Sequence, residues 1–186
     1  MDPTEAVEIP SGRWAPAYDE ETGLSSLPAL LEHLQRALVR LSRQPLTLAL
    51  LVTEVREINQ ESLPPEDKQA LTREIANRLT GAIRAGDIAG RLAPATFAML
   101  CEDLGSLDEA IRIAQRVLVA LDEPLLLGGR TLVLRPNIGL GFPVGEDRAD
   151  ELMRRSLEAL HAARANPRTR YDVILGSPDQ PRQLFH

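Results

Sequence analysis

Four stretches of the chain carry apolar residues at every third or fourth position, which is the spacing of amphipathic helices. They cover residues 26 to about 43, about 66 to 83, 106 through at least 117, and about 149 to 164. The first stretch shows the pattern in the leucines Leu27, Leu30, Leu31, Leu34, Leu38 and Leu41. Ser25 or Ser26 is available to cap it, and Ser106 and Glu109 have capping-box spacing at the start of the third stretch. The sequence therefore predicts four helices.

Short apolar runs lie between these helices and have the character of β-strands. Residues 46–53 form a nearly continuous apolar run after Pro45, as in a central strand that is covered on both faces. Residues 84–101 have the order helix end, short strand, tight turn and strand, and Gly128-Gly129 divides two apolar runs as in a hairpin. Further strands are expected at residues 137–141 and 170–175.

Composition indicates one soluble domain with an aliphatic core, because 44% of the 186 residues are apolar and only 3% are aromatic. The net charge of −6 and the pI near 5.2 argue against a nucleic-acid polymer as partner, which needs a dense basic face. A small anionic ligand held by a few arginines remains compatible with this charge. The single Cys101 cannot form an intramolecular disulfide, and no Cys/His cluster has zinc spacing, so Cys101 is expected in the core.

Both ends of the chain lack periodicity. Residues 1–17 mix prolines, glycine and acidic residues and are predicted to be a tail, with a domain at residues 18–175 and a second tail at residues 176–186. The N-terminus lacks a signal-peptide pattern and no apolar run has the length of a membrane span, so we expect a cytoplasmic protein without membrane insertion. Apolar residues in these tails, Trp14 in the first and Leu184 and Phe185 in the second, are available for contacts with other surfaces, and the sequence does not decide between them.

Several motifs stand in one order along the chain. Arg84 and Asp87 form an Arg-x-x-Asp pair five residues before the hairpin tip at residues 93–97, Ala93-Pro94-Ala95-Thr96-Phe97. Residues 19–24 read Asp-Glu-Glu-Thr-Gly-Leu, residues 110–117 read Ala-Ile-Arg-Ile-Ala-Gln-Arg-Val, and residues 137–141 read Asn-Ile-Gly-Leu-Gly. This order resembles the GGDEF diguanylate cyclase family over roughly residues 18 to 175. The resemblance implies an α/β, palm-like domain with a central, mostly antiparallel sheet flanked by helices.

The catalytic signature of that family is altered at both of its segments. The family tip carries Gly-Gly-Asp/Glu-Glu-Phe, and its carboxylates supply metal-binding and catalytic oxygen, whereas Ala95 and Thr96 bring no charge here. The family's first strand carries two aspartates, for which the spacing from Asn59 gives Leu51 and Thr53. We therefore expect a pseudo-enzyme without metal or cofactor. A replacement metal site at Glu54 and Glu57 is not expected, because strand geometry is not expected to bring them to the tip.

The Arg-x-x-Asp pair has the spacing of the family's inhibitory site, which binds the product cyclic di-GMP. An arginine can bind phosphate oxygen or the O6/N7 edge of guanine, and an aspartate can accept from guanine N1 and N2. Arg84 and Asp87 are thus the predicted ligand contacts, and Arg116 matches an arginine that completes this site in some cyclases. The resemblance implies a bacterial cyclic di-GMP receptor that signals to an unidentified protein partner, with a ligand-bridged homodimer as one possible state.

Three alternatives stay open at this stage. A bare Arg-x-x-Asp pair is commonly a solvated ion pair at a helix end, worth about 0.2–0.5 kcal/mol. Arg56, Asn59, Arg164 and Arg168 occupy positions that contact nucleotide in active family members, so the chain could instead be a metal-free GTP sensor. A third possibility is a dimerisation or docking module that binds no ligand.

Overall fold

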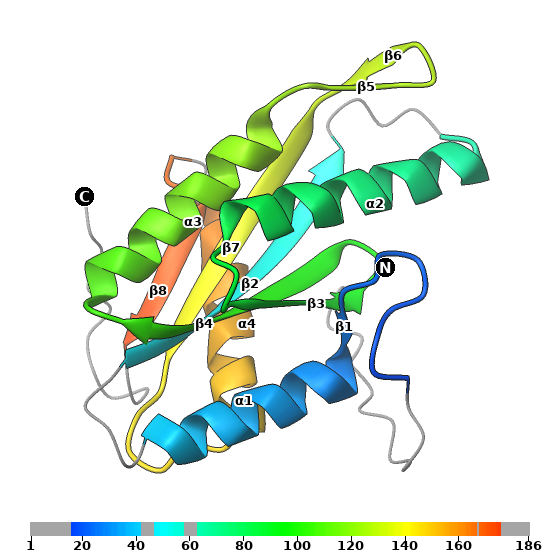
Figure 1. The fold of residues 1–186 in the computed structure, drawn as a ribbon. Helices are drawn as coiled ribbons and strands as arrows, with labels where there is room; N and C mark the ends of the chain where they lie inside the picture. Colours follow the sequence, from blue (N-terminus) through cyan, green and yellow to red (C-terminus); the bar gives the residue numbers. More distant parts are fainter. Residues whose placement is uncertain (1–15, 42–46, 58–62, 167, 176–186) are drawn as a thin grey trace.

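The computed structural model describes residues 16–41, 47–57, 63–166 and 168–175, which form a central sheet with helices on both faces (Figure 1). The six strands lie in the order β1-β3-β4-β2-β7-β8, and β5 and β6 form a separate two-stranded sheet. The elements are β1 (Ser25–Ser26), α1 (Leu27–Leu41), β2 (Thr47–Glu57), α2 (Pro65–Ala82), β3 (Ile88–Ala93), β4 (Thr96–Leu104), α3 (Leu107–Asp122), β5 (Leu125–Leu127), β6 (Arg130–Leu132), β7 (Leu134–Phe142), α4 (Ala149–Ala165) and β8 (Tyr171–Leu175).

The central sheet is mixed. β3–β4, β4–β2 and β2–β7 pair antiparallel, whereas β1 pairs parallel with β3 and β8 pairs parallel with β7. The expected α/β architecture with its predominantly antiparallel sheet is confirmed, and so are all four helices within a few residues of their predicted bounds.

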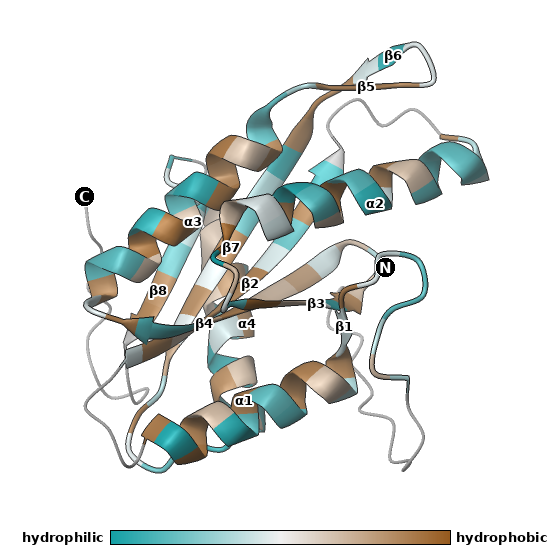
Figure 2. Ribbon diagram, viewed as in Figure 1, coloured by the Kyte–Doolittle hydropathy of each residue, from teal (hydrophilic) through white to brown (hydrophobic). Residues whose placement is uncertain are grey.

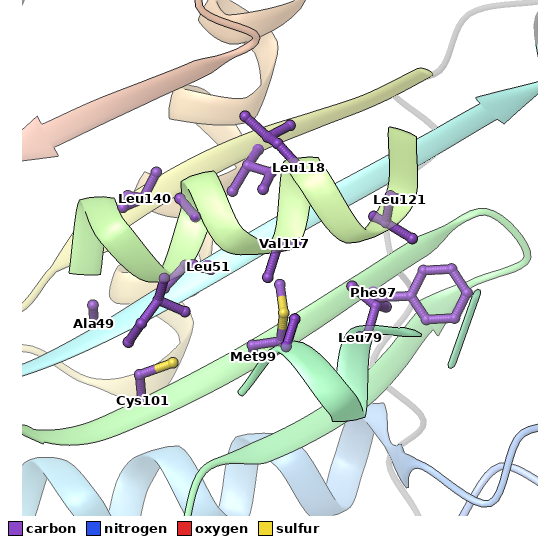
Figure 3. Packing of buried hydrophobic residues seen from close by; sticks show 14 of the residues in the cluster. Ala49, Leu51, Leu79, Phe97, Met99, Cys101, Val117, Leu118, Leu121 and Leu140 are labelled. Atoms are coloured by element: carbon purple, nitrogen blue, oxygen red, sulfur yellow. The ribbon is translucent and has the colours of Figure 1, made fainter. Parts of the chain in front are cut away.

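β2 lies in the middle of the sheet, and its side chains alternate between two hydrophobic cores. Leu51 and Val55 face the core under α2 and α3, while Leu50 and Val52 face the core under α1 and α4. A strand that is buried on both faces reads as a continuous apolar run, which explains the pattern in the sequence. In Figure 2, hydrophobic and hydrophilic residues alternate along α1, α2 and α3, as amphipathic helices require. Figure 3 shows the packing of the first core around Leu51.

Two glycines on β7 bring α4 unusually close to the sheet. A Cβ atom on Gly139 would lie 2.1 Å from the backbone nitrogen of Leu160, and one on Gly141 would lie 2.3 Å from Oγ of Ser156. The buried Ser156 hydroxyl donates to the carbonyl oxygen of Leu50, 3.0 Å away, which ties the helix to β2. This close packing fixes where the C-terminal turn of α4 lies along the end of β2.

Local sequence signals account for the connections. The Ser106 hydroxyl accepts a bond from the backbone N–H of Glu109 at 3.3 Å, which confirms the predicted cap of α3. The Gly128-Gly129 hairpin is also confirmed, and both glycines have positive φ angles of 56° and 76°, as a two-residue turn of this kind requires. This β5–β6 arm extends beyond the body of the domain (Figure 1).

The segment before α1 forms a turn that is tied to the hairpin. The Asp19 carboxylate accepts from the backbone and the hydroxyl of Thr22 at 2.9 and 2.7 Å, and Arg91 of β3 donates to the same carboxylate at 3.2 Å. Arg91 also pairs with Glu21 and donates to the carbonyl of Pro94 at 3.2 Å. Residues 19–24 therefore form a turn that leads into β1 and α1.

Two regional predictions lie wholly or mostly outside the described residues. The predicted tails fall on residues 1–15 and 176–186, apart from residues 16 and 17, so the domain boundaries stay predictions. Among the helices that the structure describes, none is both long and apolar enough to cross a membrane.

Candidate functional site

The Arg84–Asp87 segment forms a tight turn just after α2 ends at Ala82. The backbone N–H of Asp87 donates to the carbonyl of Arg84 at 3.0 Å, and the Asp87 carboxylate accepts from the backbone N–H of Arg84 at 2.9 Å. The aspartate therefore holds the backbone of the arginine, and the Arg84 guanidinium is left to other partners. The simple ion pair between these two residues, one of the alternatives for this motif, is not what the structure shows.

The guanidinium of Arg84 instead pairs with Glu109 in the first turn of α3, and its side chain remains 50% exposed. Arg116 lies seven residues further along α3, on the same side of the helix and about 10 Å from Glu109 along its axis. Its Nε donates to the carbonyl of Ala82 at 2.6 Å. One side of α3 therefore places both Arg116 and Glu109, the ion-pair partner of Arg84, near the C-terminal end of α2.

Cys101 of β4 lies beneath this turn, close to the charged side chains of Arg84, Asp87 and Arg116. Burial raises the pKa of the Cys101 thiol, the neighbouring Asp87 carboxylate raises it further, and Arg116 and Arg84 act in the opposite direction. All three predicted ligand-binding side chains are therefore within electrostatic range of one fully buried sulfur atom. Figure 3 shows Cys101 on the side of the sheet that faces α2 and α3. The prediction that Cys101 is a core residue is confirmed, but its place under Asp87 follows only from the register of β3 on β4.

The grouped side chains have the chemistry to hold a small anionic or guanine-containing ligand. A guanidinium has five donors in a fixed fork, and neither Arg84 nor the exposed Arg116 uses all of them. A carboxylate has about four acceptor positions, so Asp87 retains capacity after accepting from the backbone N–H of Arg84. Glu109 partly neutralises Arg84, and a ligand would compete with it for that arginine.

The second group of candidate residues surrounds the hairpin between β3 and β4. β2 continues to Glu57, four residues beyond the predicted end of the strand, and its register places Glu54 opposite Thr96 at the hairpin tip. The backbone N–H of Val55 donates to the carbonyl of Ala95 at 2.9 Å. The expectation that strand geometry keeps Glu54 away from the tip was therefore wrong, because the strand is longer than its apolar run.

The same register locates the positions that were matched to the family's metal-binding aspartates. Leu51 pairs with Met99, three residue pairs inward from the tip, and it is completely buried. Thr53 pairs with Phe97 and is also fully buried, and its hydroxyl has no hydrogen-bond partner. Of the strand residues beside the tip, Glu54 is the one that carries a carboxylate.

Two arginines hold that carboxylate. Arg164 from the last turn of α4 donates to it twice, from Nε at 2.9 Å and from Nη2 at 2.6 Å, and Arg56 donates from Nε at 2.9 Å. The structure thus brings Arg56 and Arg164 together as the sequence predicted, but around an internal partner. Arg168 lies exposed after α4, and Asn59 and the side chain of Glu57 fall outside the described residues. The part of the chain that the structure describes contains no group of three or more His, Cys, Asp or Glu able to hold a metal ion.

Comparison with known proteins gives one family. The model of the family described as "Diguanylate cyclase, GGDEF domain" matches residues 16–170. The cyclic di-GMP phosphodiesterase NbdA of Pseudomonas aeruginosa is 30% identical over 154 residues, and the diguanylate cyclase TpbB of the same species is 31% identical over 156. These matches cover 80% and 81% of this chain but only 19% and 36% of the two relatives, so the chain spans about a fifth and about a third of their lengths.

Solved structures show the same fold. The GGDEF domain of TpbB from P. aeruginosa is similar with a TM-score of 0.76 and 24% identity, covering 83% of this chain and 98% of that one. The GGDEF domain of DgcB from Caulobacter crescentus, solved in complex with cyclic di-GMP, has a TM-score of 0.77 and 17% identity, covering 87% and 98%. The diguanylate cyclase SiaD of P. aeruginosa, in complex with its activator SiaC, has a TM-score of 0.75 and 21% identity, covering 84% and 60%.

Proposed function

The chain belongs to the family of diguanylate cyclase GGDEF domains, and from this premise we propose that it is a catalytically inactive member that binds cyclic di-GMP as a regulatory receptor. The family makes it a GGDEF-domain module related to cyclic di-GMP metabolism. Arg84, Asp87 and Arg116 are the proposed ligand contacts. An unidentified protein partner receives the signal.

The observation that carries this proposal is that Arg84, Asp87 and Arg116 meet at the end of α2, where Asp87 binds the Arg84 backbone, Arg84 pairs with Glu109 on α3, and Arg116 of α3 binds the Ala82 carbonyl. Cyclic di-GMP offers two phosphates and two guanines, which match the free donors of the arginines and the free acceptor positions of the aspartate. The turn already fixes the backbone of Arg84 through the Asp87 carboxylate, so less ordering is needed when a ligand binds. The cyclic di-GMP complex of the similar DgcB domain lends further support.

The loss of catalysis is supported by the chemistry of the hairpin tip. Phosphoryl transfer needs metal ions to neutralise developing charge, and hard cations need carboxylate or other oxygen ligands. Ala95 and Thr96 supply no carboxylate, and the neighbouring Glu54 is already engaged by Arg56 and Arg164. A guanidinium that holds a carboxylate in two hydrogen bonds opposes metal binding there, because both cations compete for the same oxygens.

Calorimetric titration with cyclic di-GMP tests the proposal, with GTP and ligand-free buffer in parallel. The wild-type chain is expected to bind cyclic di-GMP, and Arg84→Ala is expected to bind it at least tenfold more weakly. Arg36→Ala is the matched control, because Arg36 is an exposed arginine paired with Glu32 on α1, across the sheet from the proposed site. Equal affinities of the Arg84 and Arg36 variants would count against the proposed contacts.

Mass measurement of the same samples addresses assembly. Cyclic di-GMP can stack as an intercalated dimer, so one ligand pair is proposed to bridge two copies of the chain through their Arg84 sites. The apparent mass should then rise with ligand in the wild-type protein and stay unchanged in Arg84→Ala. Wild-type protein that shows no heat and no thermal shift up to high micromolar cyclic di-GMP would instead favour a docking module without ligand.

A further inference from the structure

A groove of about 500 Å³ lies beside the turn that precedes β1, where the described part of the chain begins. Figure 1 shows this turn, in dark blue, leading through β1 into α1. The apolar lining of the groove comes from the first described residues, the start of α1 and the end of β3: Pro16, Tyr18, Leu27, Pro28 and Leu92. The Tyr18 side chain is 65% exposed. The groove therefore presents apolar surface that the described residues do not cover.

The backbone directs the residues before the groove along it. Tyr18 pairs antiparallel with Ser25, and the backbone N–H of Ser26 donates to the carbonyl of Ala17 at 3.0 Å. Chains that pair antiparallel run past each other in opposite directions, so the residues before Ala17 are directed toward Pro28 in the first turn of α1. The N-terminal segment therefore enters the domain along the apolar lining of the groove.

The spacing of side chains places a tryptophan on the same side of this segment. Alternate side chains of an extended backbone project in the same direction, and Pro16 and Tyr18 both line the groove. Trp14 precedes Pro16 by two residues, and a proline favours an extended backbone at the residue before it, Ala15. Two extended residues span about 7 Å. Trp14 can therefore reach the groove directly, without an intervening loop.

Charge favours the same arrangement. Arg91 at the groove donates to the Asp19 carboxylate at 3.2 Å and pairs with Glu21, so both of these acidic side chains are engaged. Glu20, which also lines the groove, is exposed. Arg13 stands directly before the tryptophan in the sequence, and it carries the charge that complements Glu20.

We propose that the N-terminal segment of this chain docks in the groove, with the Trp14 ring against Pro28 and Leu92 and with Arg13 beside Glu20. Burial of a tryptophan removes about 150–250 Å² of surface from water, which offsets the entropy lost when a short segment is ordered. A protein that binds this segment must first release Trp14 from the groove.

This docking does not rest on cyclic di-GMP binding. Leu92 packs on the core under α1 and α4, whereas Cys101, beneath the Arg84–Asp87 turn, belongs to the core under α2 and α3. The groove and the proposed ligand contacts are therefore on different faces of the sheet, and each can be tested while the other is left unchanged.

Fluorescence of the full chain tests the proposal without any ligand, because Trp14 is its only tryptophan. In the folded wild type the emission should be shifted to shorter wavelength than in urea, and acrylamide should quench it at least twofold less. Pro28→Asp places a carboxylate in the apolar groove and should move both readouts at least halfway to the values of the unfolded chain. This variant should fold, because an acidic residue is favourable in the first turn of a helix.

Leu107→Asp is the matched control, since it introduces the same charge in the first turn of α3, at a leucine that is 39% exposed on the other face of the sheet. It should leave the emission and the quenching of Trp14 unchanged. Glu20→Arg is a second route in case Pro28→Asp does not fold, because Glu20 is exposed. Repulsion of Arg13 should then increase quenching at low salt.

Urea unfolding provides an independent readout. Trp14→Ala should lower the urea midpoint of the wild type and leave that of Pro28→Asp unchanged, because the two residues are proposed to be in contact. Equal losses in both backgrounds would overturn the proposal, as would quenching of the folded wild type that equals quenching in urea, or unchanged Trp14 emission in folded Pro28→Asp. Protection that is lost on dilution, together with a doubled mass at high concentration, would assign the groove to Trp14 of a second copy and contradict docking within one chain.

Discussion

At one end of β2, Arg84 and Arg116 are solvent-exposed beside the Asp87 carboxylate, whereas at the other end Arg56 and Arg164 close on Glu54. The Arg84 side chain is 50% exposed and the Arg164 side chain 23%. Both ends combine arginines with acidic residues, but they differ in which donors remain free. Asp87 binds backbone and leaves guanidinium donors open, while Glu54 takes two donors of Arg164.

This difference separates two uses of the same residue type. An arginine with open donors can exchange solvent for a ligand at small cost, because the ion pair of Arg84 with Glu109 is half exposed and contributes little. An arginine that neutralises a largely buried carboxylate contributes to the stability of the fold, since removing it leaves that carboxylate without its partner. The account therefore predicts that substitutions at the Arg84 end change ligand affinity, and that substitutions at the Arg164 end change stability.

The largest expected effect is on ligand affinity. Charge-assisted hydrogen bonds contribute about 1.5–3 kcal/mol each, so Arg84→Ala should weaken cyclic di-GMP binding by roughly tenfold to a few hundredfold. Asp87→Ala should also weaken it, because the carboxylate is the proposed acceptor for guanine. Calorimetry on both variants measures the change. Unaltered affinity in Arg84→Ala would place the ligand elsewhere on the domain.

The loss of stability should follow the opposite order, and be larger for Arg164→Ala than for Arg84→Ala. Arg164→Ala leaves the Glu54 carboxylate largely buried without its two-bond partner and should lower the free energy of unfolding by about 1–3 kcal/mol. Arg84→Ala should lower it by only about 0.5 kcal/mol or less, because that ion pair is half exposed. Urea titration of the two proteins compares them directly. Similar losses in both would remove the distinction between the two ends of β2.

Smaller changes in affinity should come from the neighbours of Arg84. Arg116 also holds the carbonyl of Ala82, so Arg116→Ala should weaken cyclic di-GMP binding by about threefold to tenfold, less than Arg84→Ala. Glu109→Gln removes the charge that competes for Arg84 and should strengthen binding by about twofold to fivefold. These titrations belong at low ionic strength, where exposed charges are least screened. Weaker binding in Glu109→Gln would show that Glu109 supports the ligand-bound arrangement.

The smallest expected effect concerns catalysis, because neither the wild type nor a variant of the hairpin tip should form cyclic di-GMP. The wild-type chain incubated with GTP and magnesium or manganese should form no cyclic di-GMP, because Ala95 and Thr96 provide no metal ligand. The double variant Ala95→Asp with Thr96→Glu should also form none, since Arg56 and Arg164 retain Glu54 and Leu51 is buried in the core. Chromatographic detection of cyclic di-GMP above a control without protein would contradict the proposed loss of activity.

The fold was largely predictable from the sequence, and the exceptions have physical causes. The apolar period placed the helices, and the glycine pair placed the β5–β6 turn, because both signals are local. The end of β2 was predicted too early, since Glu54 and Arg56 interrupt the apolar run while Val55 continues the buried side of the strand. Only the strand register reveals that Glu54 lies at the hairpin tip.

The candidate sites were predictable as residues but not as contacts. Arg84, Asp87 and Arg116 follow from motif spacing, and the structure brings them together. Glu109 and Arg84 are 25 positions apart in the sequence, and Glu54 and Arg164 are 110 positions apart. A local sequence pattern therefore cannot predict either ion pair. The place of Cys101 beneath Asp87 is hidden for the same reason.

Calorimetric titration of the wild-type chain with cyclic di-GMP, beside Arg84→Ala and Arg164→Ala, tests the central claim most directly. The account predicts a measurable heat and a defined affinity for the wild type, a loss of at least tenfold for Arg84→Ala, and a change of less than about threefold for folded Arg164→Ala. Absence of binding by the wild type, or an equal loss in both variants, would contradict it.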